Sequence, residues 1–412
     1  MNILINSYAC GPNWGSEVGM GWHWVTALAN HCQLYVITEL GFKDDIEKKL
    51  PELNLKFQPK FYYVDIGDTG RILFWKQGSF KFYKYYKAWQ KNALLTANKI
   101  IKTETIDLIH QLNMIGFREP GYLWKIENKP YIIGPLGGFN MFPAAFFKLL
   151  NKKDFLFYFL RNIANYIQVN FQRRPHKAYK RAKIIILATS CKLDYFSKRF
   201  KNVKVYSETG ASILKKNAII NKPNINEKLI LGWVGLLKAR KGLPIALKAI
   251  SKSKNRDKIL LKIVGSGPNI EYYKEMSKEL DIEKSVEWFG KLPNNKTKEI
   301  ISKSHFLLIT SVLDSTTTIV FESLQSSTPV ICHDALGFGD VVDSSCGFKF
   351  QMLDFDTSVN DLTIILDNMF DKKLDYVRLV NGAKARLSKY EWDYKAKLMF
   401  NDYKNAIYEK SS

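Results

Sequence analysis

Paired cysteines and long apolar runs are both missing from this chain of 412 residues. Its five cysteines are scattered and form no C-x-x-C pair, which argues for reduced thiols and against a disulfide framework or a zinc site. No run approaches the ~20 apolar residues that span a bilayer. The first residues, MNILINSYACGPNWG, lack the basic start and long apolar core of a signal peptide. We therefore expect a cytoplasmic protein that is soluble or bound to a membrane surface.

The two common phosphate-binding fingerprints, G-x-G-x-x-G and G-x-x-x-x-G-K-[ST], are absent as well. Glycine-rich turns nevertheless follow predicted strands at residues 11–21, 134–139 and 264–268. A glycine turn before a helix lets backbone N–H groups approach an anion. Each turn alone is more typical of an ordinary tight strand-to-helix connection. Dinucleotide-binding and P-loop enzymes are therefore disfavoured, while anion binding stays open.

Acidic residues are scarce in the first half of the chain. Residues 1–222 contain 34 Lys and Arg against 15 Asp and Glu, a net charge of 34 − 15 = +19, whereas the remainder has 28 − 24 = +4. Such asymmetry indicates an anionic partner for the first half, either nucleic acid or an acidic lipid surface.

Two segments decide between these partners. Residues 69–103 contain no acid and mix eight bases with eight aromatic residues, and residues 140–183 repeat the mixture. Basic-aromatic amphipathic helices favour the headgroup region of anionic bilayers, although part of these aromatics must form the core. No nucleic-acid-binding module is recognisable, so we expect an anionic membrane surface and no nucleic acid. The candidate membrane- or acceptor-contacting residues are Arg71, Trp75, Lys84, Lys87, Arg173 and Arg174.

Short β-rich runs alternate with helical patterns along the whole chain, which predicts parallel sheets built from βαβ units. The predicted strands are ILINSY, LYVITE, IDLIHQ, YIIGP and IIILATS in the first series, and LILGWVG, ILLKIVGSG, VEWFG, HFLLITS, TPVICH and GFKF in the second. The polar stretch NKPNINEK at 221–228 resembles a linker between two such series. The predicted fold is therefore α/β, with two Rossmann-like doubly wound domains over 1–222 and 228–392. Ligands in such folds bind at the carboxyl ends of the strands.

The second series carries the residues with the most specific chemistry. A loop with Lys238, Arg240 and Lys241 follows a predicted strand, and such cations suit a diphosphate leaving group or, alternatively, a solvated surface. A helix beginning near 315–318 offers free N–H groups and its dipole to a phosphate. Asp314 stands at its start, as a ligand for sugar hydroxyls or a plain N-cap. Glu322, in the apolar context IVFESL, can accept hydrogen bonds from paired hydroxyls such as those of a ribose.

The stretch LDSTTTIVFESLQSSTPVI (313–331) resembles the glutamate–seven–glutamate signature of retaining glycosyltransferase family 4, within the glycosyl transferases group 1, whose fold is GT-B. Other stretches agree in order: GSEVGMGW, GPLGGF, SETGA, GLLKARKG, VGSGP, VEWFGKL and HDALGFGDVVD. The end of the chain resembles the family's tail, which implies a helix at about 393–412 that packs back on the first domain. The resemblance covers nearly the whole chain and implies two domains facing across a cleft.

The resemblance implies a role for each matching residue. Glu322 would bind the donor ribose, Asp314 the donor sugar, and Arg240 and Lys241 the departing diphosphate. The remaining donor-binding residues would be Gly15, Ser16, Lys238, Gly265, Ser266, Gly267, Phe289, Gly290, Lys291, Ser315, Thr316, Thr317 and Thr318. Two positions depart from the family pattern. Asp314 replaces a glutamate and is one methylene shorter, and Leu236 replaces an arginine after the strand glycine.

Two further candidates concern general-base and metal chemistry. His110 ends a predicted strand, IDLIHQ, and is the histidine best placed for a catalytic or acceptor role, although strand-end histidines are more often structural. Asp354 and Asp356 have the D-x-D spacing of metal-dependent transferases, but they precede a helical pattern, where capping is the expected use. We therefore expect neither a required metal nor another cofactor.

The resemblance implies an enzyme, a retaining glycosyltransferase that moves a hexosyl or related sugar, and we expect it to be metal-independent. The donor would be a nucleotide-sugar, and the resemblance favours a UDP-sugar because uracil is the family's commonest base. The acceptor would be lipid-linked or a growing glycan of bacterial lipopolysaccharide, capsule or exopolysaccharide, reached at the inner face of the cell membrane. The alternatives are an inactive transferase-like scaffold of a glycan-assembly complex, or a sugar-nucleotide epimerase or phosphorylase on the same fold.

Overall fold

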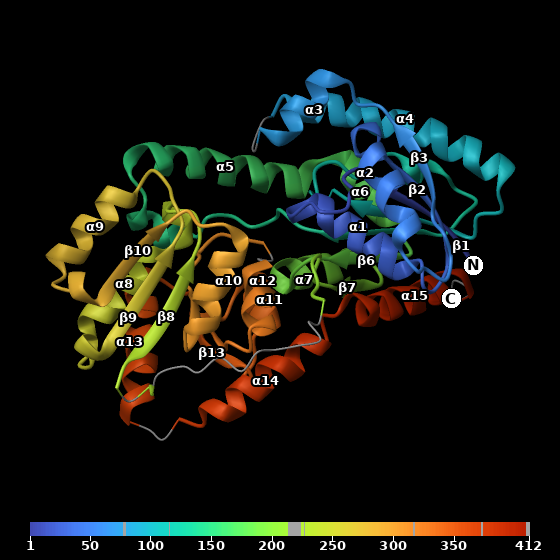
Figure 1. The fold of residues 1–412 in the computed structure, drawn as a ribbon. Helices are drawn as coiled ribbons and strands as arrows, with labels where there is room; N and C mark the ends of the chain where they lie inside the picture. The colour runs from blue at the N-terminus through green and yellow to red at the C-terminus, as the bar shows by residue number, and fades with distance from the viewer. Residues whose placement is uncertain are drawn as a thin grey trace. The chain divides into compact units, whose positions relative to one another are not determined.

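The computed structural model describes residues 1–76, 80–114, 116–212, 224–225, 227–315, 318–371 and 374–408. The chain divides into two compact units (Figure 1). Unit 1 contains Met1–Phe139, Tyr166–Gly210 and Trp392–Ser412, and unit 2 contains Asn140–Asn165 and Ala211–Glu391.

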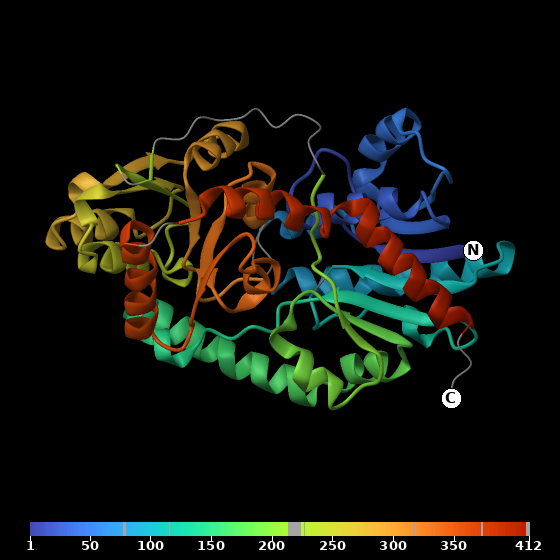
Figure 2. The same cartoon turned by 90° about the horizontal axis from the view of Figure 1, so that it is seen from below.

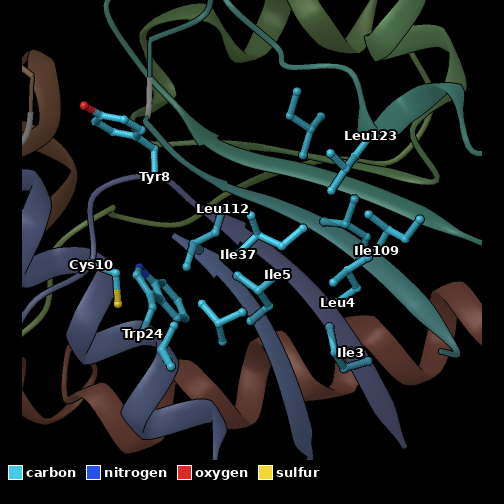
Figure 3. Packing of buried hydrophobic residues seen from close by; sticks show 14 of the residues in the cluster. Ile3, Leu4, Ile5, Tyr8, Cys10, Trp24, Ile37, Ile109, Leu112 and Leu123 are labelled. Atoms are coloured by element: carbon cyan, nitrogen blue, oxygen red, sulfur yellow. The ribbon is translucent and has the colours of Figure 1, made fainter. Parts of the chain in front are cut away.

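Unit 1 is built on a parallel seven-stranded sheet with the order β3-β2-β1-β4-β5-β6-β7. Its strands are β1 (Asn2–Ser7), β2 (Gln33–Glu39), β3 (Lys60–Val64), β4 (Leu108–Asn113), β5 (Tyr131–Leu136), β6 (Ile184–Leu187) and β7 (Val203–Val205). Central parallel strands are covered on both faces and therefore read as continuous apolar runs. Figure 3 shows this core, in which Ile3, Leu4 and Ile5 are fully buried near Trp24.

Helices connect these strands and cover the sheet. They are α1 (Ser16–Leu28), α2 (Lys43–Lys49), α3 (Asp68–Trp75), α4 (Phe82–Thr103), α6 (Arg173–Arg181), α7 (Leu193–Ser197) and α15 (Trp392–Tyr408). The last helix, α15, belongs to unit 1 although unit 2 precedes it in the chain, and it packs along α1 (Figure 2). Met399 and Tyr403 of α15 are completely buried in the unit 1 core.

Unit 2 contains a parallel six-stranded sheet with the order β10-β9-β8-β11-β12-β13. The strands are β8 (Leu229–Val234), β9 (Ile259–Val264), β10 (Val286–Gly290), β11 (Phe306–Ile309), β12 (Val330–His333) and β13 (Gly347–Phe350). The helices are α8 (Leu243–Lys252), α9 (Ile270–Glu279), α10 (Asn294–Lys303), α11 (Thr318–Gln325), α12 (Leu336–Val341), α13 (Phe355–Asp371) and α14 (Tyr376–Ser388). Both units are therefore doubly wound α/β folds, as the alternation of patterns predicts.

One helix belongs to both units. Helix α5 (Lys152–Phe171) runs from unit 2 into unit 1, because the boundary lies between Asn165 and Tyr166. Residues 140–165, which the sequence places in a first domain over 1–222, are thus part of unit 2. Phe142 and Phe146 of this segment are buried in the unit 2 core. Half of the linker expected at 221–228, namely residues 221–223 and 226, lies outside the described residues.

Candidate active site

The candidate site of unit 2 lies where the strand order reverses. Strand β8 has β9 and β10 on one side and β11, β12 and β13 on the other, so the loops after β8 and β11 leave the sheet edge in opposite directions. Such a topological switch point is where doubly wound sheets bind ligands. The loop after β8 carries Arg240 and Lys241, and the loop after β11 carries Asp314.

These three charged side chains form one cluster. Lys241 Nζ makes an ion pair with Asp314 Oδ2, and Arg240 Nη1 lies 3.4 Å from Asp314 Oδ1. Arg240 Nη1 also donates a 3.0 Å hydrogen bond to the carbonyl oxygen of Leu313. All three side chains are less than a third exposed. Two cations therefore share one carboxylate in a partly desolvated position, which leaves an excess of positive charge there.

Backbone contacts fix the two loops against each other. Gly242 adopts φ 65°, and a Cβ at this position would lie 2.1 Å from the carbonyl oxygen of Thr310. The Thr310 hydroxyl donates to the Lys241 carbonyl over 3.1 Å, and Val312 N–H donates to the Arg240 carbonyl over 2.9 Å. Only glycine permits both this conformation and this approach, so the sequence KARKG determines where the cations lie.

The turn after β9 lies beside the same loop. Gly265 has φ 149°, and a Cβ there would lie 1.8 Å from the carbonyl oxygen of Gly235, at the end of β8. Gly265 N–H donates to the Gly290 carbonyl over 2.8 Å, and Leu237 N–H donates to the Ser266 carbonyl over 3.0 Å. The predicted residues of 235–241, 265–267 and 289–291 are thus brought together by backbone contacts. Lys238, Ser266 and Lys291 have exposed side chains.

The helix that follows Asp314 carries the second acid. Helix α11 begins at Thr318, which is exposed, and Glu322 is half-buried between the buried side chains of Phe321 and Ser323. Asn294 Nδ2 of α10 donates a 3.3 Å hydrogen bond to Glu322 Oε1. The Glu322 carboxylate is therefore reachable by a ligand. Thr316 and Thr317, which the resemblance also implicates, lie outside the described residues, whereas Ser315 is half-buried.

One contact to this cluster could not be predicted from the sequence. Asn140 Nδ2 donates a 2.7 Å hydrogen bond to the backbone carbonyl of Asp314. Asn140 is held in turn by Asn165, whose Nδ2 lies 3.4 Å from the Asn140 carbonyl oxygen. Its only sequence signal is its place directly after GPLGGF, because the contact spans 174 residues. Leu236, at the position of the family's arginine, is a large apolar side chain exposed at the end of β8.

Gly15 and Ser16 lie in unit 1, at the start of α1 and after β1. The glycines that follow allow α1 to approach the preceding loop closely. A Cβ at Gly19 would lie 2.1 Å from the Trp14 carbonyl oxygen, and one at Gly21 would lie 2.2 Å from the Ala9 carbonyl oxygen. The glycines of GSEVGMG thus allow α1 to pack closely on the preceding loop, and Gly15 itself is exposed.

The expectation that His110 takes a catalytic or acceptor role needs correction. The ring is completely buried in unit 1, with Nε2 2.7 Å from the Gly134 carbonyl oxygen and Nδ1 2.6 Å from the Tyr403 hydroxyl. Because a carbonyl can only accept, Nε2 donates and the neutral Nδ1 accepts from Tyr403. Burial lowers the pKa of His110 from its usual 6.5 to about 4. His110 therefore holds α15 against β4 and β5 and presents no ring nitrogen to a ligand.

The D-x-D pair lies at the N-terminus of α13. Asp354 Oδ1 accepts a 2.9 Å hydrogen bond from Thr357 N–H, and Asp354 Oδ2 accepts from the Thr357 hydroxyl over 2.7 Å, which lowers the pKa of Asp354. Asp356 makes an ion pair with Lys148. The capping role predicted for this motif is confirmed. Within the described residues, no group of three or more His, Cys, Asp or Glu side chains is placed to hold a metal ion.

Two of the candidate membrane-contacting bases are engaged inside unit 1. Arg71 makes ion pairs with Glu39, Asp65 and Asp68, at distances of 2.6 to 3.0 Å. Arg174 makes an ion pair with the buried Glu119. The neighbouring acids thus hold both guanidinium groups, which are not free for phosphate as the sequence suggested.

The other four candidates, Trp75, Lys84, Lys87 and Arg173, are exposed. Part of the aromatic set, including Phe82, Tyr86 and Trp89, forms core, as expected. None of the described helices has the length and apolar character needed to cross a membrane.

Two doubly wound parallel sheets, with a charged cluster at the switch point of the second, define the GT-B fold. Comparison with solved structures agrees. The lipopolysaccharide outer core galactosyltransferase WaaB has a TM-score of 0.61 at 16% identity, with all of both chains covered. Anabaena HepE in complex with UDP has a TM-score of 0.58 at 14% identity, covering 98% of this chain and all of that chain.

Sequence comparison identifies the family that the second unit resembles. Residues 215–375 match the family model "Glycosyl transferases group 1". A curated relative, an uncharacterised glycosyltransferase of Methanocaldococcus jannaschii, is 26% identical over 184 residues. That match spans 44% of this chain and 46% of the relative, which is less than half of either protein.

Proposed function

We propose that this protein is a retaining, metal-independent glycosyltransferase that uses a nucleotide-sugar donor. The observation that carries the proposal is the cluster of Arg240, Lys241 and Asp314 at the switch point of a unit that matches the glycosyl transferases group 1 model. Preorganised cations are what the transfer of a sugar from a diphosphate requires, because negative charge develops on the leaving group. Binding of UDP by the structural neighbour HepE supports a UDP-sugar as donor.

Each group of the site has a role in this reaction. Arg240 and Lys241 stabilise the departing diphosphate, and the N–H groups at the start of α11 add to the field. The Glu322 carboxylate accepts hydrogen bonds from the ribose hydroxyls, and Asp314 contacts the sugar while holding the two cations. The acceptor oxygen bonds to the anomeric carbon on the face from which the diphosphate leaves, and its proton passes to the departing phosphate oxygen, so the configuration at the anomeric carbon is retained. Catalysis then consists of positioning and charge stabilisation, without a protein nucleophile.

The proposed acceptor is a lipid-linked or growing glycan of a bacterial surface polysaccharide, reached from the cytoplasmic side of the membrane. Two observations support it. The first is the structural likeness to WaaB, a galactosyltransferase of the lipopolysaccharide outer core. The second is the basic first half of the chain, since residues 1–222 contain 34 bases and 15 acids and therefore carry a net charge of +19. No observation favours the epimerase, phosphorylase or scaffold alternatives.

Turnover of nucleotide-sugars tests the proposal. Purified protein is incubated with UDP-, GDP-, ADP- and CMP-sugars, with and without an acceptor lipid extract, and the released nucleotide is measured in the presence of EDTA. We expect one donor class to be consumed. The variant Arg240→Ala should lower kcat by about 10²–10³-fold, the usual loss when one such electrostatic donor is removed. Lys284→Met, at an exposed position of the same unit, is the matched control. Absence of turnover with every donor would support the scaffold alternative instead.

A further inference from the structure

Helix α5 exposes an unusually apolar face. Nine large apolar side chains of this helix are each at least 42% exposed, and eight of them lie within roughly 160° of its circumference at 3.6 residues per turn, with Phe157 just outside that arc. These eight are Phe155, Leu156, Phe159, Leu160, Ile163, Tyr166, Ile167 and Phe171, here called the outward face of α5. A helix fixes the angular positions of its own side chains, so this face is continuous although α5 enters both units. Contiguous apolar surface of this kind marks an interaction site.

The opposite side of α5 faces the protein and carries several polar side chains. Asn162 donates to the Phe142 carbonyl over 2.7 Å and accepts from Phe142 N–H over 2.9 Å. Gln168 Oε1 accepts from Arg118 Nε over 2.5 Å. An ordinary surface helix buries its apolar stripe and exposes its polar one. Helix α5 packs Tyr158 and Val169 together with polar side chains against the protein, whereas most of its large apolar side chains are directed outward.

The positive charges around this face favour an anionic binding partner. Lys152 and Lys153 are exposed and lie, by helical spacing, on the same side as the outward face, whereas Asp154 lies on the opposite side. Asp154 is the only acid in residues 140–183, against ten bases. The whole chain carries a net charge of +23. A second copy of the chain would bring the same positive charge to the contact, which is unfavourable, while acidic lipid would neutralise it.

We propose that the outward face of α5 lies in the headgroup region of an anionic bilayer, with the helix parallel to the membrane. Its 20 residues provide about 30 Å of length at 1.5 Å per residue. Three phenylalanines and a tyrosine along the face suit the boundary between headgroups and acyl chains. The inference deepens the proposed function by naming the surface that brings the site to a lipid-linked acceptor. Only the biological purpose of membrane binding rests on the proposed function, because binding to lipid does not require a sugar donor.

Flotation of the full chain with lipid vesicles tests the inference. We expect binding to vesicles rich in phosphatidylglycerol and weak binding to phosphatidylcholine alone. Leu156→Gln with Leu160→Gln should lower the partition coefficient at least about tenfold, because two exposed leucines that the bilayer would bury are lost. Lys152→Gln with Lys153→Gln should lower it up to roughly thirtyfold, since each base contributes about 1 kcal/mol. These positions are exposed, so we expect the variants to keep the far-ultraviolet circular dichroism of the wild type.

The control is a double variant of the same kind elsewhere, Ile364→Gln with Val377→Gln, on exposed positions of α13 and α14. It should bind vesicles like the wild type. Equal binding by the α5 leucine variant, or no vesicle binding at all, would overturn the inference. A dimer that this variant dissociates, without vesicle binding, would instead assign the face to a second copy. Nucleotide binding measured on the same preparations tests the proposed function separately, because α5 variants should retain it.

Discussion

The buried ring of His110 predicts a pH dependence of stability that can be worked out from the structure. Its pKa is about 4 in the folded protein, against about 6.5 for a solvated imidazole. Between these two values the unfolded chain binds the proton and the folded chain does not. The stability that the neutral His110 ring contributes is therefore fully present above pH 6.5, and it is lost progressively as the pH decreases from 6.5 to 4.

The size of this effect follows from the two pKa values. A difference of 6.5 − 4 = 2.5 corresponds to a maximum of about 3.4 kcal/mol, reached below pH 4. At pH 5 the unfolded state is largely protonated and the folded state largely neutral, which costs about 2 kcal/mol. His333, whose buried ring in unit 2 has a pKa of about 3, adds a contribution of the same sign.

The assay is urea unfolding of wild type and His110→Gln at pH 8 and pH 5. The glutamine can still donate to the Gly134 carbonyl, but it does not titrate. We expect the free energy of unfolding of unit 1 to fall by about 2 kcal/mol more in the wild type than in the variant between the two pH values. His333→Gln should leave this unit 1 difference unchanged. Equal pH dependence of wild type and His110→Gln would refute the assignment of a buried, neutral ring.

Three further predictions concern the site in unit 2. Asp314→Asn removes the counter-charge of two partly buried cations, so the free energy of unfolding in urea should fall by about 1–3 kcal/mol, between the values for exposed and buried ion pairs. An added nucleoside diphosphate should restore part of this loss. An unchanged midpoint of the urea transition would contradict the pairing. Gly265→Ala should destabilise unit 2 by more than about 3 kcal/mol because its Cβ meets a carbonyl oxygen. Gly290→Ala, which has φ 65° but nothing within 4 Å, should cost only about 1–2 kcal/mol, and equal losses would be inconsistent with the steric argument. Asn140→Ala removes the hydrogen bond that positions the Asp314 backbone, so steady-state kinetics should show kcat/KM about fivefold lower, or about 1 kcal/mol, with partial recovery in Asn140→Gln, whereas a change in stability alone would point to a merely structural role.

Much of the fold could be predicted from local patterns. Apolar runs such as ILINSY and LILGWVG correspond to the central strands β1 and β8, because a strand covered on both faces needs apolar residues at every position. The strands that the patterns did not reveal are β3 (KFYYV) and β7 (VKV), at the two edges of the first sheet. Edge strands are only partly buried, so their apolar signal is weak.

The loops of the candidate site could also be predicted, because glycines and charges at strand ends are local features. Contacts between distant segments could not. The segment 140–165 reads as a continuation of the first series, yet it packs in unit 2 and brings Asn140 to Asp314. Arg71 reads as a free base in an acid-poor stretch, but it is paired with acids just outside that stretch and with Glu39. Charge counts along a sequence do not record such pairs.

The central claim is that the switch point of unit 2 binds the nucleotide of a sugar donor. A thermal-shift panel of UDP, GDP, ADP and CMP on wild type, Glu322→Ala and the exposed control Glu279→Ala tests it most directly. A ligand at 100 times its Kd adds about 2.7 kcal/mol of stability. We predict that one nucleotide, UDP, stabilises the wild type and the control but not Glu322→Ala. If no nucleotide stabilises the wild type, or if Glu322→Ala responds like the control, the assignment of the donor site is contradicted.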